Sequence, residues 1–174
     1  MHNWKLISTK VVFDGYRKVE RHRYLMPDNE EREFDIVDTG QSVCALVITK
    51  DNQVVLAKEF RPGPGKVLLE LPGGGINDGE DAETAIKREV AEETGYSGDI
   101  QPVGRAYKDA YSTHTVSGFL ITNAEITTVP ENNPAEPISV ELLSIEEFKE
   151  HLLGGDLTDI TTAHQALARL ESKN

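Results

Sequence analysis

The chain has 174 residues, enough for one domain or for one domain with an appendage. With 38% hydrophobic and 28% charged residues it has the composition of a folded soluble protein, which excludes a disordered chain. The net charge of −12 argues against a nucleic-acid or anionic-membrane surface, because both favour basic patches.

The sequence lacks the signals of membrane-spanning, secreted and disulfide-bonded proteins. No apolar run approaches the roughly 18 residues that a membrane-spanning helix needs, and the N-terminus lacks the apolar core of a signal peptide. The single cysteine, Cys44, lies in the apolar run VCALVI, where we expect a buried small hydrophobe and no internal disulfide. We therefore expect a cytoplasmic protein.

The first 25 residues are basic although the chain is acidic. They contain six Lys/Arg and two acids. Such a segment serves an anionic small ligand or a partner subunit, or it is a hairpin edge guarded by solvated cations. The sequence leaves these interpretations open.

Short strands separated by turns fill the N-terminal part of the chain. We predict strands at residues 4–13, 16–26 and 32–38. The turn Asp14-Gly15 is typical of a hairpin. We expect residues 1–40 to form a β-rich subdomain and residues 41–174 to form the main domain.

Strands and helices are mixed in the rest of the chain. We predict strands at 42–49, 54–60, 67–72, 100–107, 115–122 and 138–143, and helices at 81–94, 144–153 and 159–171. Ser144 and Glu147 form a capping-box pattern, and Gly95 is a helix stop. The class is therefore mixed α/β.

The helix at 81–94 has acids on its apolar side. With about 100° of rotation per residue, its apolar stripe consists of Ala82, Ala85, Ile86 and Val90. Glu89 and Glu93 fall inside this stripe, and Glu92 lies on its margin. Lys87 and Arg88 project to the water side. The three glutamates are i, i+3 and i+4 neighbours, so we expect their side chains to converge.

Converging carboxylates need a cation, because burying an unpaired charge is costly. Since Lys87 and Arg88 point elsewhere, a hard divalent ion is the better solution. Mg²⁺ binds oxygen ligands, typically a few carboxylates together with substrate phosphates. An acidic helix edge that simply reaches solvent is the alternative.

A run of three glycines, Gly73 to Gly75, precedes this helix. Glycines allow close backbone approach and positive φ, and they can present carbonyls to a metal or amides to a phosphate oxygen. The run matches neither the phosphate loop of NTPases nor the dinucleotide fingerprint. Its position before the acidic helix favours a metal–phosphate site.

The combined pattern resembles that of a known family. The spacing Gly74-x5-Glu80-x7-Arg88-Glu89-Val90-x-Glu92-Glu93-x-Gly95-Tyr96 is similar to the Nudix box, G-x5-E-x7-R-E-U-x-E-E-x-G-U, where U is a bulky aliphatic residue. The one departure is the aromatic Tyr96, at a packing position. The resemblance implies an α/β/α sandwich with a mixed sheet that cleaves nucleoside-linked pyrophosphates with Mg²⁺ or Mn²⁺.

The resemblance also implies roles for individual residues. The metal ligands would be Glu89, Glu92, Glu93 and the backbone carbonyl of Gly73, and Gly74 would lie at the substrate. Glu80 would be a structural or outer acid. Arg88 would orient the helical glutamates through a salt bridge. Metal and phosphate positioning would supply most of the rate acceleration.

The sub-group that hydrolyses ADP-ribose and other nucleotide sugars is the nearest resemblance outside the box. It implies a general base at Glu136, upstream of an Ile-x-Val strand. Pro134 stands where a second acid is common, so Glu131 is the fallback.

Other residues outside the box are assigned from the same resemblance. Arg61 would contact a substrate phosphate, whereas the alternative is a surface arginine in a Pro/Gly loop. Glu70 would lie near the metals and substrate. Tyr16 and Tyr24 are candidates for stacking on the base, although core packing is the simpler interpretation of both. We expect His114 to lie in a loop near the substrate mouth.

Three functions remain open at this point. A nucleotide-sugar hydrolase is favoured. Tyr111 stands where ADP-ribose enzymes often have a proline, which leaves a GDP-sugar open and makes a dinucleoside polyphosphate hydrolase the second candidate. A non-catalytic Nudix-like binding module is third, because the chain keeps all four box acids and Arg88. By resemblance, and because a three-stranded appendage leaves edges to cover, we expect a homodimer.

Overall fold

The computed structural model describes residues 4–131, 134–135 and 137–172. The chain forms two compact units. The first comprises the chain up to Gln41 together with Tyr107–Thr115, and the second comprises Ser42–Ala106 and the chain from Val116 onward. In the described residues, no helix is long and apolar enough to span a membrane.

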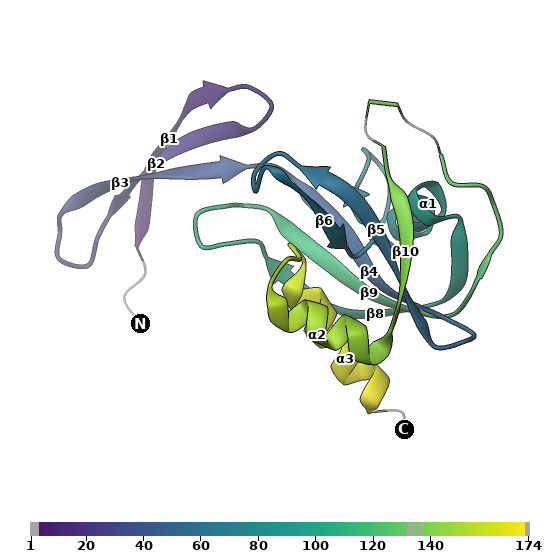
Figure 1. Cartoon of the computed structure of the whole chain (residues 1–174). Coiled ribbons are helices and arrows are strands. Elements are labelled where there is room, and N and C mark those ends of the chain that lie inside the picture. The colour runs from purple at the N-terminus through teal and green to yellow at the C-terminus, as the bar shows by residue number, and fades with distance from the viewer. Residues whose placement is uncertain (1–3, 132–133, 136, 173–174) are drawn as a thin grey trace. The chain divides into compact units, whose positions relative to one another are not determined.

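The first unit is built on a three-stranded antiparallel sheet with the order β1-β2-β3 (Figure 1). Its strands are β1 (Lys5–Asp14), β2 (Lys18–Leu25) and β3 (Glu31–Asp38). This confirms the predicted strands and the hairpin at Asp14-Gly15. The strand pairing places acids opposite bases: Arg21 bonds Asp35 at 2.7 Å, and Arg23 bonds Glu33 at 3.0 Å. Much of the basic charge of this segment is therefore neutralised within the sheet.

A segment distant in sequence completes the first unit. The backbone N–H of Val37 donates to Tyr111 O at 2.9 Å, and the N–H of Thr113 donates to Val37 O at 3.0 Å. The Thr113 hydroxyl also donates to Asp38 at 2.7 Å. Residues 107–115 are thus fixed to β3, an association that no local sequence pattern predicted.

The second unit contains a seven-stranded sheet. Its strands are β4 (Gln41–Thr49), β5 (Gln53–Arg61), β6 (Lys66–Glu70), β7 (Gly73–Gly75), β8 (Tyr96–Tyr107), β9 (Thr115–Ile126) and β10 (Ser139–Ser144). The order is β10-β5-β4-β9-β8, with β6 paired to β5 and β7 paired to β4. The prediction missed β7, because the glycine run reads as a loop, and it began β8 too late.

Three helices cover the two faces of this sheet: α1 (Ala82–Thr94), α2 (Ile145–Gly154) and α3 (Ile160–Glu171). Strand β4 explains the layers. Its residues Cys44, Leu46 and Ile48 pack with α2 and α3, whereas the intervening Val43, Ala45 and Val47 pack with α1. A strand buried on both faces reads as a continuous apolar run. The predicted α/β/α sandwich is confirmed.

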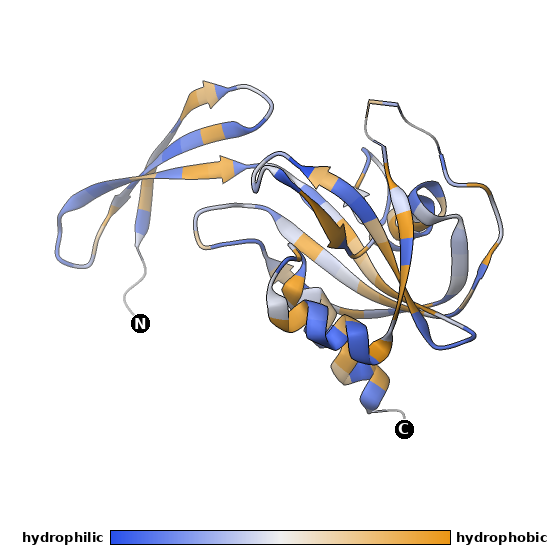
Figure 2. Cartoon of the chain, viewed as in Figure 1, coloured by the Kyte–Doolittle hydropathy of each residue, from blue (hydrophilic) through white to orange (hydrophobic). Residues whose placement is uncertain are grey.

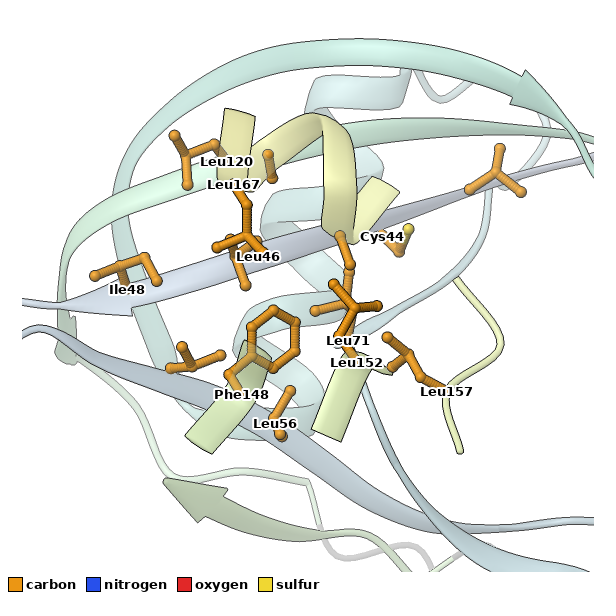
Figure 3. Packing of buried hydrophobic residues seen from close by; sticks show 14 residues of the cluster. Cys44, Leu46, Ile48, Leu56, Leu71, Leu120, Phe148, Leu152, Leu157 and Leu167 are labelled. Carbon is orange, nitrogen blue, oxygen red and sulfur yellow. The ribbon is translucent and has the colours of Figure 1, made fainter. Parts of the chain in front are cut away.

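The larger core cluster lies under α2 and α3. Figure 3 shows Phe148 and Leu152 of α2 among Leu46, Leu56 and Leu71 of the sheet region, and all are buried. Both helices carry hydrophobic and hydrophilic stretches, as expected of helices with one face in a core (Figure 2). Cys44 is buried here, as predicted.

Capping residues lie at the ends of α1 and α2, and of these the Ser144–Glu147 capping box and the Gly95 stop were predicted. The Asp81 carboxylate accepts from the Thr84 N–H at the start of α1, and the Ser144–Glu147 capping box is formed at the start of α2. Gly95 ends α1 in the left-handed conformation, with φ of 75°. Asp81 and Gly95 therefore set the two ends of α1, the helix that carries the acids.

Candidate active site

Glu89 and Glu92 of helix α1 are partly buried, as the helical wheel predicts. Ala85, Ile86 and Val90 are buried against the sheet. The Glu89 side chain is only 14% exposed, and that of Glu92 is 35% exposed. Burial raises the pKa of Glu89, although Arg88 partly opposes this effect. Glu89 therefore lies in surroundings that disfavour its charge.

Arg88 lies at the centre of this acidic group, and here the wheel prediction was wrong. The guanidinium of Arg88 donates to Glu80 at 2.9 and 3.0 Å, to Glu89 at 2.7 Å and to Glu92 at 3.1 Å. It also donates to the carbonyl of Gly75 at 3.0 Å. A long side chain reaches well away from the direction of its Cα–Cβ bond. Hydrogen bonds to Glu80 first, and to Glu89 and Glu92, raise the pKa of Arg88.

Glu93 is held apart from this group. Its carboxylate accepts the backbone N–H of Gly73 at 2.9 Å. Burial first, and then the nearby charges of Glu59 and Glu89, raise its pKa to about 8 against the lowering effects of the Gly73 N–H and Arg61. Glu93 therefore binds a proton near neutral pH unless a cation takes its place.

The glycine run provides close approach rather than positive φ. Strand β7 pairs with β4, opposite Ser42, Val43 and Cys44. A Cβ on Gly73 would collide with the backbone of Val43 and Cys44, and a Cβ on Gly74 would lie 2.5 Å from the Glu89 carboxylate. Gly75 has open space around it. Gly73 and Gly74 thus bring the backbone against the sheet and against Glu89.

Arg61 lies at the end of β5 between two buried carboxylates. Its guanidinium contacts Glu59 at 2.5 Å and donates from Nε to Glu70 at 2.8 Å. The Arg61 side chain is 31% exposed, so it is not the loosely held surface arginine of the alternative interpretation. Its contact with a substrate phosphate stays a prediction.

Glu70 has a structural partner that the sequence did not reveal. This fully buried carboxylate accepts the backbone N–H of Thr158 at 2.8 Å and its hydroxyl at 2.7 Å, as well as the Arg61 bond. It therefore ties β6 to the segment between α2 and α3. Its predicted place near the metals and substrate is not tested by these contacts.

Glu59 is the acid that the sequence analysis passed over. It is 5% exposed on β5, and its charge acts on Glu93. Strand alternation places it on the face of Val55, which packs with α1. An acid at an inward strand position is the same signal that identified Glu89 and Glu93 on the helix.

The donor chemistry of these residues fits a hard divalent ion. Glu80, Glu89 and Glu92 place three carboxylates around the one guanidinium of Arg88, with Glu93 nearby. The net charge of these side chains is negative, and all the atoms that could bind a metal are oxygens. Within the described part of the chain, no three His, Cys, Asp or Glu side chains are already close enough to hold one ion. The predicted convergence is therefore partial, because Arg88 joins Glu89 to Glu92 while Glu93 turns to Gly73.

The segment that follows β9 runs alongside the end of α1. The N–H of Glu131 donates to the Glu92 carbonyl at 2.7 Å. Pro134 is exposed. Glu136, the predicted base, lies outside the described residues, so the choice between Glu136 and Glu131 stays open.

The aromatic and histidine candidates belong to the first unit. Tyr24 contacts the rings of Trp4 and Phe34, whereas Tyr16 is 99% exposed, so the packing interpretation of Tyr16 was wrong. Tyr111 stacks on Phe34 with centroids 6.4 Å apart. The buried His114 ring bonds the Thr39 hydroxyl at 2.9 Å, and burial lowers its pKa.

Comparison with known proteins gives a family match over most of the chain. The model of the NUDIX domain matches residues 38–163. A solved structure described as an ADP compounds hydrolase aligns with a TM-score of 0.85 and 16% sequence identity, covering all of this chain and 97% of its own. At that identity the likeness establishes the fold alone.

Two curated relatives are similar in sequence as well. The chain is 29% identical over 155 residues to an ADP-sugar pyrophosphatase of Mus musculus, covering 79% of this chain and 71% of the relative. It is 33% identical over 151 residues to an ADP-ribose pyrophosphatase of Saccharomyces cerevisiae, covering 72% and 62%. The chain thus spans less than two thirds of the yeast protein.

Proposed function

The chain belongs to the Nudix hydrolase family, and from this premise we propose that it hydrolyses the pyrophosphate bond of a nucleoside diphosphate sugar. The substrate class includes ADP-ribose and GDP-sugars, and the products are a nucleoside monophosphate and a sugar phosphate. The observation that carries the proposal is the group of partly and mostly buried glutamates on α1 beside the glycines of β7. The names of the mouse and yeast relatives support the substrate class.

Glu89, Glu92, Glu93 and the backbone carbonyl of Gly73 would hold Mg²⁺ or Mn²⁺. When bound, the ion neutralises the charge of the diphosphate and lowers the pKa of a bound water. Glu93, with its raised pKa, would release its proton as it becomes a ligand.

The remaining residues orient these ligands. Arg88 holds Glu89 and Glu92 at fixed positions relative to each other, while Glu80 holds Arg88 in turn. The Gly73 N–H holds one oxygen of Glu93. Such outer contacts set ligand orientation and affinity.

Substrate contacts are proposed for Arg61 and Gly74, and a role in substrate binding through Arg61 is proposed for Glu70. Arg61 carries its charge at the partly exposed end of β5, where a bidentate phosphate contact is chemically suitable. Gly74 leaves room for close approach at Glu89. Glu70 would act by holding Arg61 in place.

A carboxylate on the loop after β9 would act as the general base. We assign this role to Glu136 from the family pattern and keep Glu131 as the second candidate. General-base catalysis contributes about 10²–10⁴-fold. Separate Glu136→Gln and Glu131→Gln variants distinguish them, since only loss of the base lowers kcat by this factor.

The test is a substrate panel with product analysis. The wild-type protein with Mg²⁺ should convert at least one of ADP-ribose, a GDP-sugar and a UDP-sugar to a monophosphate and a sugar phosphate. The Glu93→Gln variant and excess EDTA should abolish turnover. Release of ATP or ADP from a dinucleoside polyphosphate, with the nucleotide sugars intact, would instead identify the second candidate. Binding of nucleotide sugars with no turnover of the panel would point to the binding module.

A cytoplasmic homodimer is also proposed. All ten residues of β1 are exposed within a single chain, including Leu6, Ile7 and Phe13. A second copy would cover this apolar edge strand. Light scattering at micromolar concentration should give twice the 19.3 kDa chain mass, and a monomeric mass would count against the dimer.

A further inference from the structure

Gly95 is the last glycine of the acidic motif, and its surroundings differ from those of an ordinary helix stop. Its φ is 75°, and its N–H donates to the Ala91 carbonyl at 3.0 Å. Left-handed backbone alone does not require glycine, because asparagine tolerates it. This chain places Asn29, Asn52 and Asn123 at positive φ. Lack of space for a side chain is a second and separate requirement that can favour glycine at such a position.

That requirement is space for the segment after β9. A Cβ on Gly95 would lie 2.5 Å from the Thr128 carbonyl oxygen and 3.1 Å from Pro130 Cδ. The first of these is a backbone atom that no side-chain rotation can move. Gly155, which ends α2 with φ of 77°, has nothing within 4 Å of the same position. The two helix stops share a conformation but differ in what lies against them.

Three hydrogen bonds from residues 127–131 to the end of α1 show that this close approach is a built contact. The carbonyl of Gly95 accepts the N–H groups of Thr127 at 2.9 Å and Thr128 at 3.2 Å. The carbonyl of Glu92 accepts the Glu131 N–H at 2.7 Å, and the Ala91 carbonyl accepts the N–H of Gly95 itself. The last carbonyls of a helix lack partners within the helix. Here residues 127–131 supply three N–H donors to the carbonyls of Glu92 and Gly95, and Figure 1 shows this stretch passing beside α1.

We propose that Gly95 is a positioning residue, which lets residues 127–131 pack on the end of α1 and so fixes this stretch relative to Glu92 and Glu93. Its catalytic consequence rests on the proposed function, whereas the anchoring does not. The residues that hold the segment lie one turn or less from the proposed metal ligands. The loop that starts at this anchor carries both candidates for the base in the sequence.

The test compares matched variants, Gly95→Asn and Gly155→Asn. Asparagine accepts left-handed backbone in both, so only Gly95→Asn adds a Cβ against the Thr128 carbonyl. Amide hydrogen exchange of Thr127, Thr128 and Glu131 should become at least tenfold faster in Gly95→Asn, while amides in the middle of α1 stay protected. The kcat for the nucleotide sugar found in the panel should fall at least tenfold. Gly155→Asn should match wild type in both measurements.

Two outcomes overturn the inference. One is equal exchange and equal kcat in the two asparagine variants. The other, which needs no variant to fold, is unprotected exchange of the three amides in the wild-type protein. If the wild type turns over no substrate of the panel, the proposed function fails, and the exchange experiment still tests the anchor.

Discussion

The carboxylate of Glu93 accepts the backbone N–H of Gly73 at 2.9 Å, which joins helix α1 to strand β7 across 20 residues of sequence. One hydrogen bond does not offset the burial of this carboxylate, because its pKa is still raised to about 8. Glu93 is therefore most stable when it is protonated or bound to a cation.

The raised pKa of Glu93 makes metal-free stability depend on pH. The folded protein keeps this proton up to about pH 8, whereas the unfolded chain loses it near 4.5. The folded state thus binds more protons in this window, and its stability falls as the pH rises. We expect the free energy of unfolding of the wild type to fall, relative to that of Glu93→Gln, by on the order of a few kcal/mol between about pH 5 and 8. Chemical denaturation in EDTA measures both proteins. Parallel pH curves for the two proteins would contradict the assigned burial.

Removing the Arg88 guanidinium should release the glutamates that it orients. We expect Arg88→Ala to lower Mn²⁺ affinity and kcat by about 10–100-fold, the usual effect of losing a contact behind the metal ligands. Lys87→Ala is the matched control, since Lys87 lies on the water side of α1 and pairs with the exposed Glu83. Calorimetric titration with Mn²⁺ measures the affinity, and equal losses in both variants would refute a specific role of Arg88.

Adding a methyl group at Gly74 should disturb the site more than the fold. Its Cβ would meet the Glu89 carboxylate at 2.5 Å, the far end of a side chain that can move away. Gly74→Ala should therefore reduce kcat at least tenfold while the melting temperature changes little. Gly75→Ala adds its methyl group in open space and should behave as wild type. A Gly74→Ala enzyme with normal kcat would show that Glu89 need not stay where it is.

The Thr158 hydroxyl should contribute measurably to stability although it lies outside the acidic helix. Thr158→Val removes one of the hydrogen bonds to the buried Glu70 and should cost about 1–3 kcal/mol. Thr161→Val, at an exposed position on α3, is the control with the same change in side chain. Urea denaturation measures both, and equal stabilities would mean that Glu70 does not depend on this bond.

The acids of α1 could be predicted because helical periodicity is a local property. The wheel placed Glu89 and Glu93 on the sheet side, and the structure has them there. The same wheel misplaced Arg88, because it gives the direction of the Cα–Cβ bond and not the reach of a long side chain. Glu59 could have been found by applying strand alternation to β5 with equal care.

Other features depend on contacts between distant segments and had no local signal. The pairing of Thr158 with Glu70 joins residues 88 apart in the sequence. The attachment of Tyr111 to Val37 and the packing of Thr128 on Gly95 are likewise set by tertiary structure. A single sequence shows which residues are unusual, and the fold decides which of them meet.

In the proposed mechanism, carboxylates of α1 hold a divalent ion against a diphosphate. The most direct measurement is Mn²⁺ binding in the presence of a non-hydrolysable ADP-ribose analogue, followed by electron paramagnetic resonance. We expect wild type and the control Glu83→Gln, altered on the water side of α1, to bind Mn²⁺ alike, and Glu93→Gln to bind it at least tenfold more weakly. Equal Mn²⁺ affinity in Glu93→Gln and wild type would contradict this mechanism.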